Sequence, residues 1–250
     1  MPPSIEAPES FKDVKVLVFD VFGTCVDWRT SVKRALEQKT GRTDAADLAQ
    51  KWRQGYIESV TRLAQTLEPE RDEYPELDDI FRGILDDTVL TKDDELNEQD
   101  RRELSQCWHK LLPWPDTNKG LALLSEDQGL TTGTLSNGSV RLLIDLKKYG
   151  HMPFDVIFSS ELFRSYKPSP HIYKGAVKLL GLQPHQVCMV AAHAKDLYAA
   201  KRCGLMTAFV YRPGEGHAPD EIQPGDASID IIAKDFIHLA QMIAKVRDHE

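Results

Sequence analysis

The feature that most constrains the fold of this chain is a series of short apolar runs that alternate with helical patterns. The first run, residues 14–19 (VKVLVF), is rich in β-branched residues and stops at Asp20, shortly before a glycine turn. Such a run is typical of a strand buried in a parallel sheet. Further runs follow at residues 130–135, 156–158, 187–191 and 206–210. Because helical segments separate them, the sequence predicts an α/β fold with a doubly wound parallel sheet.

A long helical insertion lies between the first run and the others. Residues 28–115 show no convincing strand, and their helical patterns cover residues 32–39, 45–65, 76–90 and 97–111. We therefore predict a core domain made of residues 1–27 and 116–250, with a helical cap domain formed by residues 28–115. A last helix from near Asp235 is expected to close the core, because apolar residues recur on one face at helical spacing: Phe236, Leu239, Ile243 and Val246.

Charge and cysteine content narrow the classes of partner. The chain of 250 residues has 31 Lys and Arg against 39 Asp and Glu, a net charge of −8, and shows no basic patch that could follow a phosphate backbone. We therefore expect no nucleic-acid partner. No apolar run approaches the roughly 18 residues that span a bilayer, so we expect no membrane partner either. The four cysteines lack a C-x-x-C pair, which favours reduced thiols and a cytoplasmic location, and a homodimer stays open.

Polar residues follow several of the predicted strands at the point where each strand ends. In chain order they are Asp20, Thr24, Ser136, Asn137, Lys167, His193 and Asp196. Each has an ordinary explanation on its own, such as a turn or a helix N-cap. Because ligands of doubly wound sheets bind beyond the carboxyl ends of the strands, we expect these residues to converge on one pocket.

One cation of the insertion falls on an apolar helix face. On a helical wheel of residues 48–64 the polar residues occupy one half, whereas Arg53 lies in the other half beside Trp52, Tyr56 and Val60. A guanidinium stays charged, so on a buried face it needs an anionic or hydrogen-bonding partner. The wheel leaves three interpretations open: an arginine that snorkels to water, a structural ion pair, or a contact with a ligand.

The polar residues lie in motifs that resemble those of the haloacid dehalogenase superfamily. F-D-V-F-G-T, L-S-N-G-S, Y-K-P-S-P and A-A-H-A-K-D follow in the superfamily's order and span nearly the whole chain. Within the superfamily the chain is most similar to the type II L-2-haloacid dehalogenases, because W-R-Q at residues 52–54 and the spacing from Lys167 to Tyr173 also match. The resemblance implies a Rossmann-like core with a helical cap inserted after the first strand.

The resemblance also implies a catalytic role for the charged residues of the predicted pocket. Asp20 is the expected nucleophile, which displaces a halide and forms an ester that water then hydrolyses. Lys167 is expected to keep Asp20 ionised, and Arg53 is expected to accept the departing halide. Asp196 is expected to orient the hydrolytic water or to pair with Lys167.

Other residues of the motifs are expected to hold the substrate. Their hydroxyl groups and turn amides suit the substrate carboxylate or Asp20, and the residues are Thr24, Phe22, Ser136 and Asn137. Tyr173 either frames the substrate or packs in the core. His193 departs from the pattern, because the well-known dehalogenases carry Asn at this place and Ser at that of Ala191. Its imidazole is expected either to act as general base in ester hydrolysis or to hold water by a hydrogen bond.

Two positions separate the chain from the magnesium phosphatases of the same superfamily. Those phosphatases place a second Asp two residues after the nucleophile, where this chain has Phe22, and an extra acid in the last motif, where it has Ala192. The remaining carboxylates, Asp20 and Asp196, make a poor Mg²⁺ site. We therefore expect no metal and no other cofactor. The loop at residues 214–217 (GEGH) is expected to have no role.

The predicted activity is that of a metal-independent hydrolase of the (S)-2-haloacid dehalogenase type. Its substrates are small carboxylic acids, namely short 2-haloalkanoic acids, which it converts to 2-hydroxy acids through an ester on Asp20. One alternative keeps the mechanism and acts on a related acid such as azetidine-2-carboxylate, in which a strained ring nitrogen leaves. Another is a non-catalytic binding module that retains the fold. The set of Asp20, Lys167 and Asp196 argues against that module.

Overall fold

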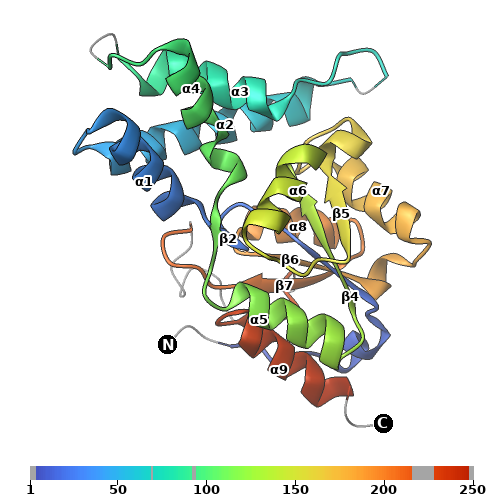
Figure 1. Ribbon diagram of the computed structural model, residues 1–250. Coiled ribbons are helices and arrows are strands. Elements are labelled where there is room, and N and C mark those ends of the chain that lie inside the picture. The colour runs from blue at the N-terminus through green and yellow to red at the C-terminus, as the bar shows by residue number, and fades with distance from the viewer. Residues whose placement is uncertain (1–3, 69, 92–93, 216–227, 248–250) are drawn as a thin grey trace.

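The computed structural model describes residues 4–68, 70–91, 94–215 and 228–247. Its centre is a six-stranded sheet in the order β5-β4-β1-β6-β7-β8, in which all neighbouring strands are parallel (Figure 1). The strands are β1 (Val16–Phe19), β4 (Thr131–Ser136), β5 (Val156–Ser159), β6 (Val187–Ala191), β7 (Met206–Val210) and β8 (Ile231–Ala233). The predicted α/β fold is confirmed. Strand β8 was not predicted.

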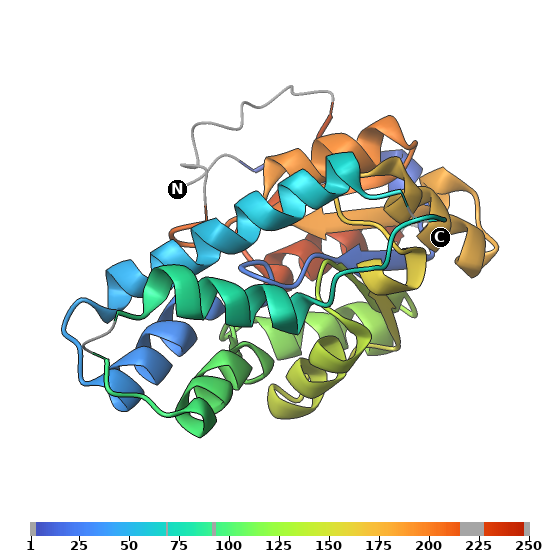
Figure 2. The same cartoon turned by 90° about the horizontal axis from the view of Figure 1, so that it is seen from above.

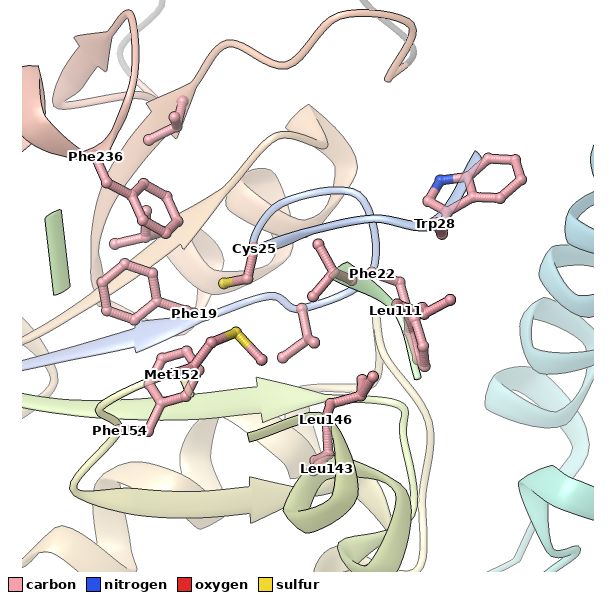
Figure 3. Close-up of a cluster of buried hydrophobic side chains, with 14 of the residues drawn as sticks. Phe19, Phe22, Cys25, Trp28, Leu111, Leu143, Leu146, Met152, Phe154 and Phe236 are labelled. Carbon is pink, nitrogen blue, oxygen red and sulfur yellow. The ribbon is translucent and has the colours of Figure 1, made fainter. Parts of the chain in front are cut away.

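Burial on both faces explains why β1 is apolar throughout. Leu17 and Phe19 belong to the apolar cluster on one face of the sheet, and Val16 and Val18 belong to the cluster on the other. Phe19 packs between Phe236 and Phe154, whose ring centroids lie 5.1 and 5.8 Å from its own (Figure 3). The first face is covered by α5 (Thr117–Ala122), α6 (Val140–Tyr149) and α9 (Phe236–Arg247), and the second by α7 (Pro170–Leu180) and α8 (Ala194–Arg202). Helix α9 begins where the last helix was predicted.

The insertion forms a group of helices on one side of the sheet (Figure 1). It contains α1 (Trp28–Thr40), α2 (Ala45–Thr66), α3 (Leu77–Ile84) and α4 (Glu98–Ser105). Helices α2 and α3 lie side by side in the view from above (Figure 2). Although α2 has 22 residues, no helix among the described residues is both long and apolar enough to cross a membrane.

The helix boundaries of the insertion differ from the predicted ones. Helix α1 begins at Trp28 rather than at residue 32, because the Asp27 carboxylate accepts a hydrogen bond of 3.1 Å from the Thr30 amide and caps the first turn. The patterns over 76–90 and 97–111 are not continuous α-helices. A π-helical turn at Leu85–Val89 follows α3, and a 3₁₀ turn at Gln106–His109 follows α4.

Two short strands join the places where the chain enters and leaves the helical group. Strand β2 (Val26–Asp27) pairs antiparallel with β3 (Leu112–Pro113). The prediction that residues 28–115 contain no strand is therefore wrong at β3, since a two-residue pairing leaves no alternation to detect. Cys25 reinforces the junction, because its carbonyl accepts hydrogen bonds from the Trp114 amide at 3.0 Å and from the Thr117 hydroxyl at 2.8 Å.

Candidate active site

Asp20 follows β1, the strand between β4 and β6, and is the centre of the site. Its Oδ1 accepts a hydrogen bond of 2.9 Å from the Lys167 Nζ, and its Oδ2 accepts one of 2.8 Å from the Thr24 hydroxyl. The Nδ1 of His193 lies 3.2 Å from the same Oδ2. Burial by itself raises the pKa of the Asp20 carboxyl, but the Lys167 and His193 cations outweigh it and hold that pKa well below its usual range. Asp20 is thus a buried carboxylate that stays ionised.

Lys167 links Asp20 to a second carboxylate. It lies in the loop before α7, and its Nζ also donates to Asp196 Oδ2 at 2.5 Å. Burial lowers the pKa of the Lys167 ammonium. Asp196 and Asp20 raise that pKa by a larger amount, so the net shift is upward. The Tyr173 hydroxyl donates to the other oxygen of Asp196 at 2.5 Å. Tyr173 is completely buried. Its phenol reaches the site only by its hydrogen bond to the Asp196 carboxylate.

Turn residues after β1 and β4 fix the loops that carry these groups. Besides its bond to Asp20, the Thr24 hydroxyl accepts a hydrogen bond of 3.0 Å from the Ala192 amide. The Asn137 side-chain oxygen accepts one of 2.8 Å from the Lys167 amide and one of 2.8 Å from the Ser160 hydroxyl. Ser136 Oγ accepts the Gly138 amide at 3.3 Å. The structure thus brings the predicted residues of several strand ends to one place, and Asn137 positions the lysine loop.

Arg53 reaches this place from α2 in the helical group. Only 6% of the residue is exposed, and its guanidinium lies among the rings of Tyr56, Trp28 and Phe22 at centroid distances of 4.9, 5.4 and 5.6 Å. Its Nη2 makes a long contact of 3.5 Å with the carbonyl oxygen of Phe22, two residues after Asp20. Its buried Nη1 has no hydrogen-bond partner within the described ranges. Figure 3 shows Phe22 and Trp28 on the side that faces the helical group.

These contacts decide between the interpretations of Arg53. Its burial excludes an arginine that snorkels to water, and the described residues provide no ion pair for it. A charged, buried donor without a partner is costly, because a lost hydrogen bond is not replaced by water. Cation–π contacts offset part of this cost. The unpaired Nη1 is therefore suited to an anion that the protein itself does not supply.

His193 and Glu215 form the other side of the site. The Nε2 of His193 lies 3.0 Å from Glu215 Oε2, so the imidazole bridges Asp20 and Glu215. Burial lowers the pKa of His193, but Asp20 and Glu215 outweigh it and raise that pKa to about 9. At neutral pH the His193 imidazole is therefore protonated, and it lies between Asp20 and Glu215.

Glu215 is a residue of the candidate site that the sequence analysis missed. The sequence analysis expected no role for residues 214–217, but the structure places Glu215 against His193, whereas His217 lies outside the described residues. Glu215 is 5% exposed and accepts a hydrogen bond of 2.6 Å from the Trp28 indole. It follows the end of β7, so the same inspection of strand ends that found Asp20 and Asp196 was able to find it.

The close approach of Glu215 also explains a glycine of the first motif. Gly23 has a φ of +84°, which favours glycine, and a Cβ built there lies 2.3 Å from Glu215 Oε2. A side chain at this position therefore collides with the carboxylate. The F-G-T turn is shaped to admit Glu215 as well as to turn the chain.

Known proteins resemble this chain in sequence and in fold. A family model described as haloacid dehalogenase-like hydrolase matches residues 14–204. The crystal structure of a defluorinating L-2-haloacid dehalogenase is similar with a TM-score of 0.83 and 34% identity, over 97% of this chain and 99% of that chain. The (S)-2-haloacid dehalogenase 4A of Burkholderia cepacia is 28% identical over 93% of this chain and 97% of its own. A phosphoglycolate phosphatase of Aliivibrio fischeri is 25% identical over 95% and 100%.

The chain belongs to the haloacid dehalogenase-like hydrolases. Within this family it is similar to the L-2-haloacid dehalogenases, which are hydrolases that act on carbon–halide bonds. The predicted family and the predicted class of enzyme are thereby confirmed. The substrate and the roles of single residues are matters of proposal.

Proposed function

We propose that this enzyme removes halide from C2 of short (S)-2-haloalkanoic acids without a metal ion and releases 2-hydroxy acids. The observation that carries the proposal is the pairing of two buried charges. An ionised Asp20 is held by Lys167, and beyond it the Arg53 guanidinium keeps an unpaired Nη1 in an aromatic cage. A nucleophile and a cation that can receive the leaving anion are the groups that a displacement at carbon needs.

In the first step a carboxylate oxygen of Asp20 attacks C2 of the substrate from the side opposite the halogen. A carbon–oxygen bond forms, the carbon–halogen bond breaks, and its electron pair leaves with the halide toward Arg53. The Thr24 hydroxyl is already bonded to Asp20, so it steadies the nucleophile. The Ser136 hydroxyl and the turn amides near Phe22 and Asn137 are then the proposed donors to the substrate carboxylate. Holding both ends of the acid fixes the angle of attack.

In the second step water attacks Cγ of the Asp20 ester. The acyl–oxygen bond breaks, the 2-hydroxy acid leaves, and Asp20 regains a carboxylate that carries one oxygen of that water. Asp196 and His193 are the groups beside Asp20 that are proposed to orient or activate the water. Asp196 is held by Lys167 and Tyr173, which leaves His193 as the more accessible of the two, with 30% of its side chain exposed.

Halide release from (S)-2-chloropropionate tests the proposal. Wild type is expected to release chloride, and Asp20→Asn is expected to release none, since an amide is not a nucleophile of comparable strength. Single-turnover reaction in ¹⁸O-labelled water is expected to place the label in Asp20, which peptide mass spectrometry can detect. Absence of chloride from wild type across chloro, bromo and fluoro acids overturns the proposal.

The unpaired donor of Arg53 favours a halide over other leaving groups. The ring nitrogen of azetidine-2-carboxylate leaves as an amine and needs a proton rather than a cation, so Arg53 gives it no advantage. A phosphatase reaction is disfavoured by Phe22, which fills the place of a second acidic residue with a ring packed against Tyr56 and Trp108. The proposed substrates are thus small carboxylic acids. The four free cysteines fit the cytoplasm as the proposed compartment.

A further inference from the structure

The loop that carries Lys167 is held from the side of the helical group as well as from the core. From the core, the Asn137 side-chain oxygen accepts the Lys167 amide at 2.8 Å. From the helical group, residues 72–75 reach the same loop, and we call these four residues the contact segment. It lies between α2 and α3 and runs beside the chain that leads to α7 (Figure 2). The proposed displacement uses Lys167 but assigns no role to this contact.

Tyr166, the residue before Lys167, is the centre of the contact. It is completely buried, and its ring stacks on that of Tyr74 with centroids 5.0 Å apart and an interplanar angle of 15°. Its hydroxyl donates a hydrogen bond of 2.7 Å to the carbonyl oxygen of Pro75. Burial raises the pKa of Tyr166 to about 12, so this hydroxyl stays protonated and remains a donor. The stacked ring and the hydrogen bond together fix the position and the rotation of the Tyr166 side chain.

Arg164 fixes the same loop at a second point. Its Nη2 donates a hydrogen bond of 2.7 Å to the carbonyl oxygen of Asp72. Its backbone has a φ of +48°, in the left-handed region that favours glycine, and a non-glycine residue there is strained. Contacts from the surroundings must hold such a residue in place, and the bond to the Asp72 carbonyl is one of them. The chain from Arg164 to Tyr166 therefore depends on the contact segment for its conformation.

A shift of Tyr166 is passed on to Lys167. Neighbouring Cα atoms across a trans peptide lie about 3.8 Å apart, so the two residues move together. Tyr166 extends toward the contact segment, whereas the Lys167 Nζ donates to Asp20 at 2.9 Å and to Asp196 at 2.5 Å. These two carboxylates compete for one ammonium, and the attraction between charges weakens as their distance grows. The position of the loop therefore decides how strongly the Lys167 charge acts on Asp20.

We propose that Tyr166 is a positioning residue that the contact segment holds in place, and that it keeps the Lys167 ammonium against Asp20 during the displacement of halide. This inference rests on the proposed function, because it concerns the first step of that reaction. The contact segment follows α2, the helix that also carries Arg53. Because a helix is stiff, the place of the halide acceptor and the place of the lysine are coupled through one element.

The Tyr74→Leu variant tests the inference, because it removes the stacked ring of the contact segment and leaves the sequence around Lys167 unchanged. The measurement is chloride release from (S)-2-chloropropionate in a single turnover, with enzyme at saturating concentration and in excess over substrate. We expect the rate constant of this step to fall about 10- to 100-fold, since a catalytic group that is out of place loses much of its effect. Loss of folded molecules alone does not change this rate constant while folded enzyme remains in excess.

Three further variants make the comparison specific. Tyr74→Phe keeps the ring and is expected to restore the rate constant to within about threefold of wild type. Tyr149→Leu, at an exposed tyrosine that ends α6, is the matched control and is expected to keep the wild-type rate constant. Tyr166→Phe removes only the hydroxyl that binds Pro75, and it is expected to slow the step about 3- to 10-fold. It covers the case in which Tyr74→Leu does not fold.

Reductive methylation of Lys167 in the unliganded protein gives a readout that does not depend on turnover. In wild type the ammonium is buried between two carboxylates, so we expect it to react slowly with formaldehyde and cyanoborohydride. Peptide mass spectrometry measures this rate against that of the exposed Lys33 on α1. Tyr74→Leu is expected to raise the rate at Lys167 several-fold, whereas Tyr149→Leu is expected to leave it unchanged.

These measurements distinguish failure of the inference from failure of the proposed function. An unchanged rate constant in Tyr74→Leu, or in Tyr166→Phe should Tyr74→Leu not fold, overturns the inference. A slower step with unchanged methylation of Lys167 also overturns it, because the loss then arises elsewhere, and so does an equal loss in Tyr149→Leu. If wild type releases no chloride, the proposed function fails, and the methylation rates alone decide whether the contact segment holds Lys167.

Discussion

Arg53 and Arg212 are two buried arginines that the protein treats in opposite ways. Both lie among aromatic rings, and they are 6% and 4% exposed. Arg212 forms a bidentate pair with Asp116 at 2.6 and 2.9 Å, and its Nε donates to the Thr24 carbonyl at 2.8 Å. Arg53 has one long contact with a carbonyl and a buried Nη1 without a partner in the described parts of the chain.

We interpret the difference as that between a structural cation, Arg212, and the proposed anion acceptor, Arg53. A bidentate arginine has its charge and geometry satisfied by the fold, so its removal damages the fold. An arginine without a partner lowers the stability of the fold locally, and the rest of the structure offsets this loss. Its removal is therefore expected to weaken ligand binding at that place. Arg212 also connects the loop after β7 to the turn after β1 through Thr24 and to the start of α5 through Asp116. Arg53 lies on α2 and meets the turn after β1 through a long contact with the Phe22 carbonyl and through the Phe22 ring.

Of the single substitutions, we expect Arg212→Met to lower the free energy of unfolding the most. It leaves Asp116 partly buried without its cation, which is expected to lower the free energy of unfolding by about 3–5 kcal/mol. Chemical denaturation measured by circular dichroism checks this. The double variant Arg212→Met/Asp116→Leu is expected to recover part of the loss, because it removes the uncompensated charge. A single variant as stable as wild type contradicts the structural role.

Arg53→Met is expected to lower the activity without lowering the stability, which is the opposite of Arg212→Met. Loss of the cation that receives the halide is expected to lower kcat for halide release by about 100- to 1,000-fold, or about 3–4 kcal/mol in the transition state. The free energy of unfolding is expected to stay equal or to rise, because an unsatisfied buried charge is replaced by an apolar chain. Steady-state kinetics and denaturation of the same preparation measure both. Strong destabilisation with normal kcat assigns Arg53 to the fold instead.

The two arginines also show which features of the site can be predicted from the sequence. Arg53 was predicted as a site residue because a helical wheel places it among apolar residues and the W-R-Q segment resembles the family. Arg212 was not singled out, since its partner Asp116 is 96 residues away along the chain. The strands β6 and β7 were predicted with the bounds that the structure shows, because burial on both faces leaves continuous apolar runs.

Glu215 was missed for a related physical reason. A G-E-G segment after a strand has the composition of a solvated loop, and its burial arises from Trp28 and Arg29, which are distant in sequence. The position after β7 places this loop at the same edge of the sheet as Asp20, whereas the burial of Glu215 shows only in the tertiary structure. The sequence analysis found His193 as a departure from the family motif. It did not find Glu215, the second partner of the His193 ring.

Binding of a free halide is the smallest effect that distinguishes the two arginines. If Nη1 of Arg53 is an anion acceptor, bromide binds the folded protein and stabilises it by about 1 kcal/mol at about five times its Kd, since ligand that binds only the folded state adds RT ln(1 + [L]/Kd). For a chain of this size that corresponds to a rise in Tm of about 2–4 °C. Differential scanning fluorimetry at constant ionic strength, with gluconate in place of bromide as control, measures it.

The same bromide titration on the two arginine variants tests whether the anion binds at Arg53. Arg53→Met is expected to lose the bromide effect completely, because the substitution removes the unpaired Nη1 that is proposed to receive the anion. Arg212→Met is expected to keep it at its own lower Tm, since the guanidinium of Arg212 is saturated by Asp116 and holds no halide. An equal bromide shift in wild type and Arg53→Met shows that the anion binds elsewhere. Arg53 then loses its assignment as acceptor, while the nucleophile, its lysine and the imidazole between two carboxylates are unaffected by that result.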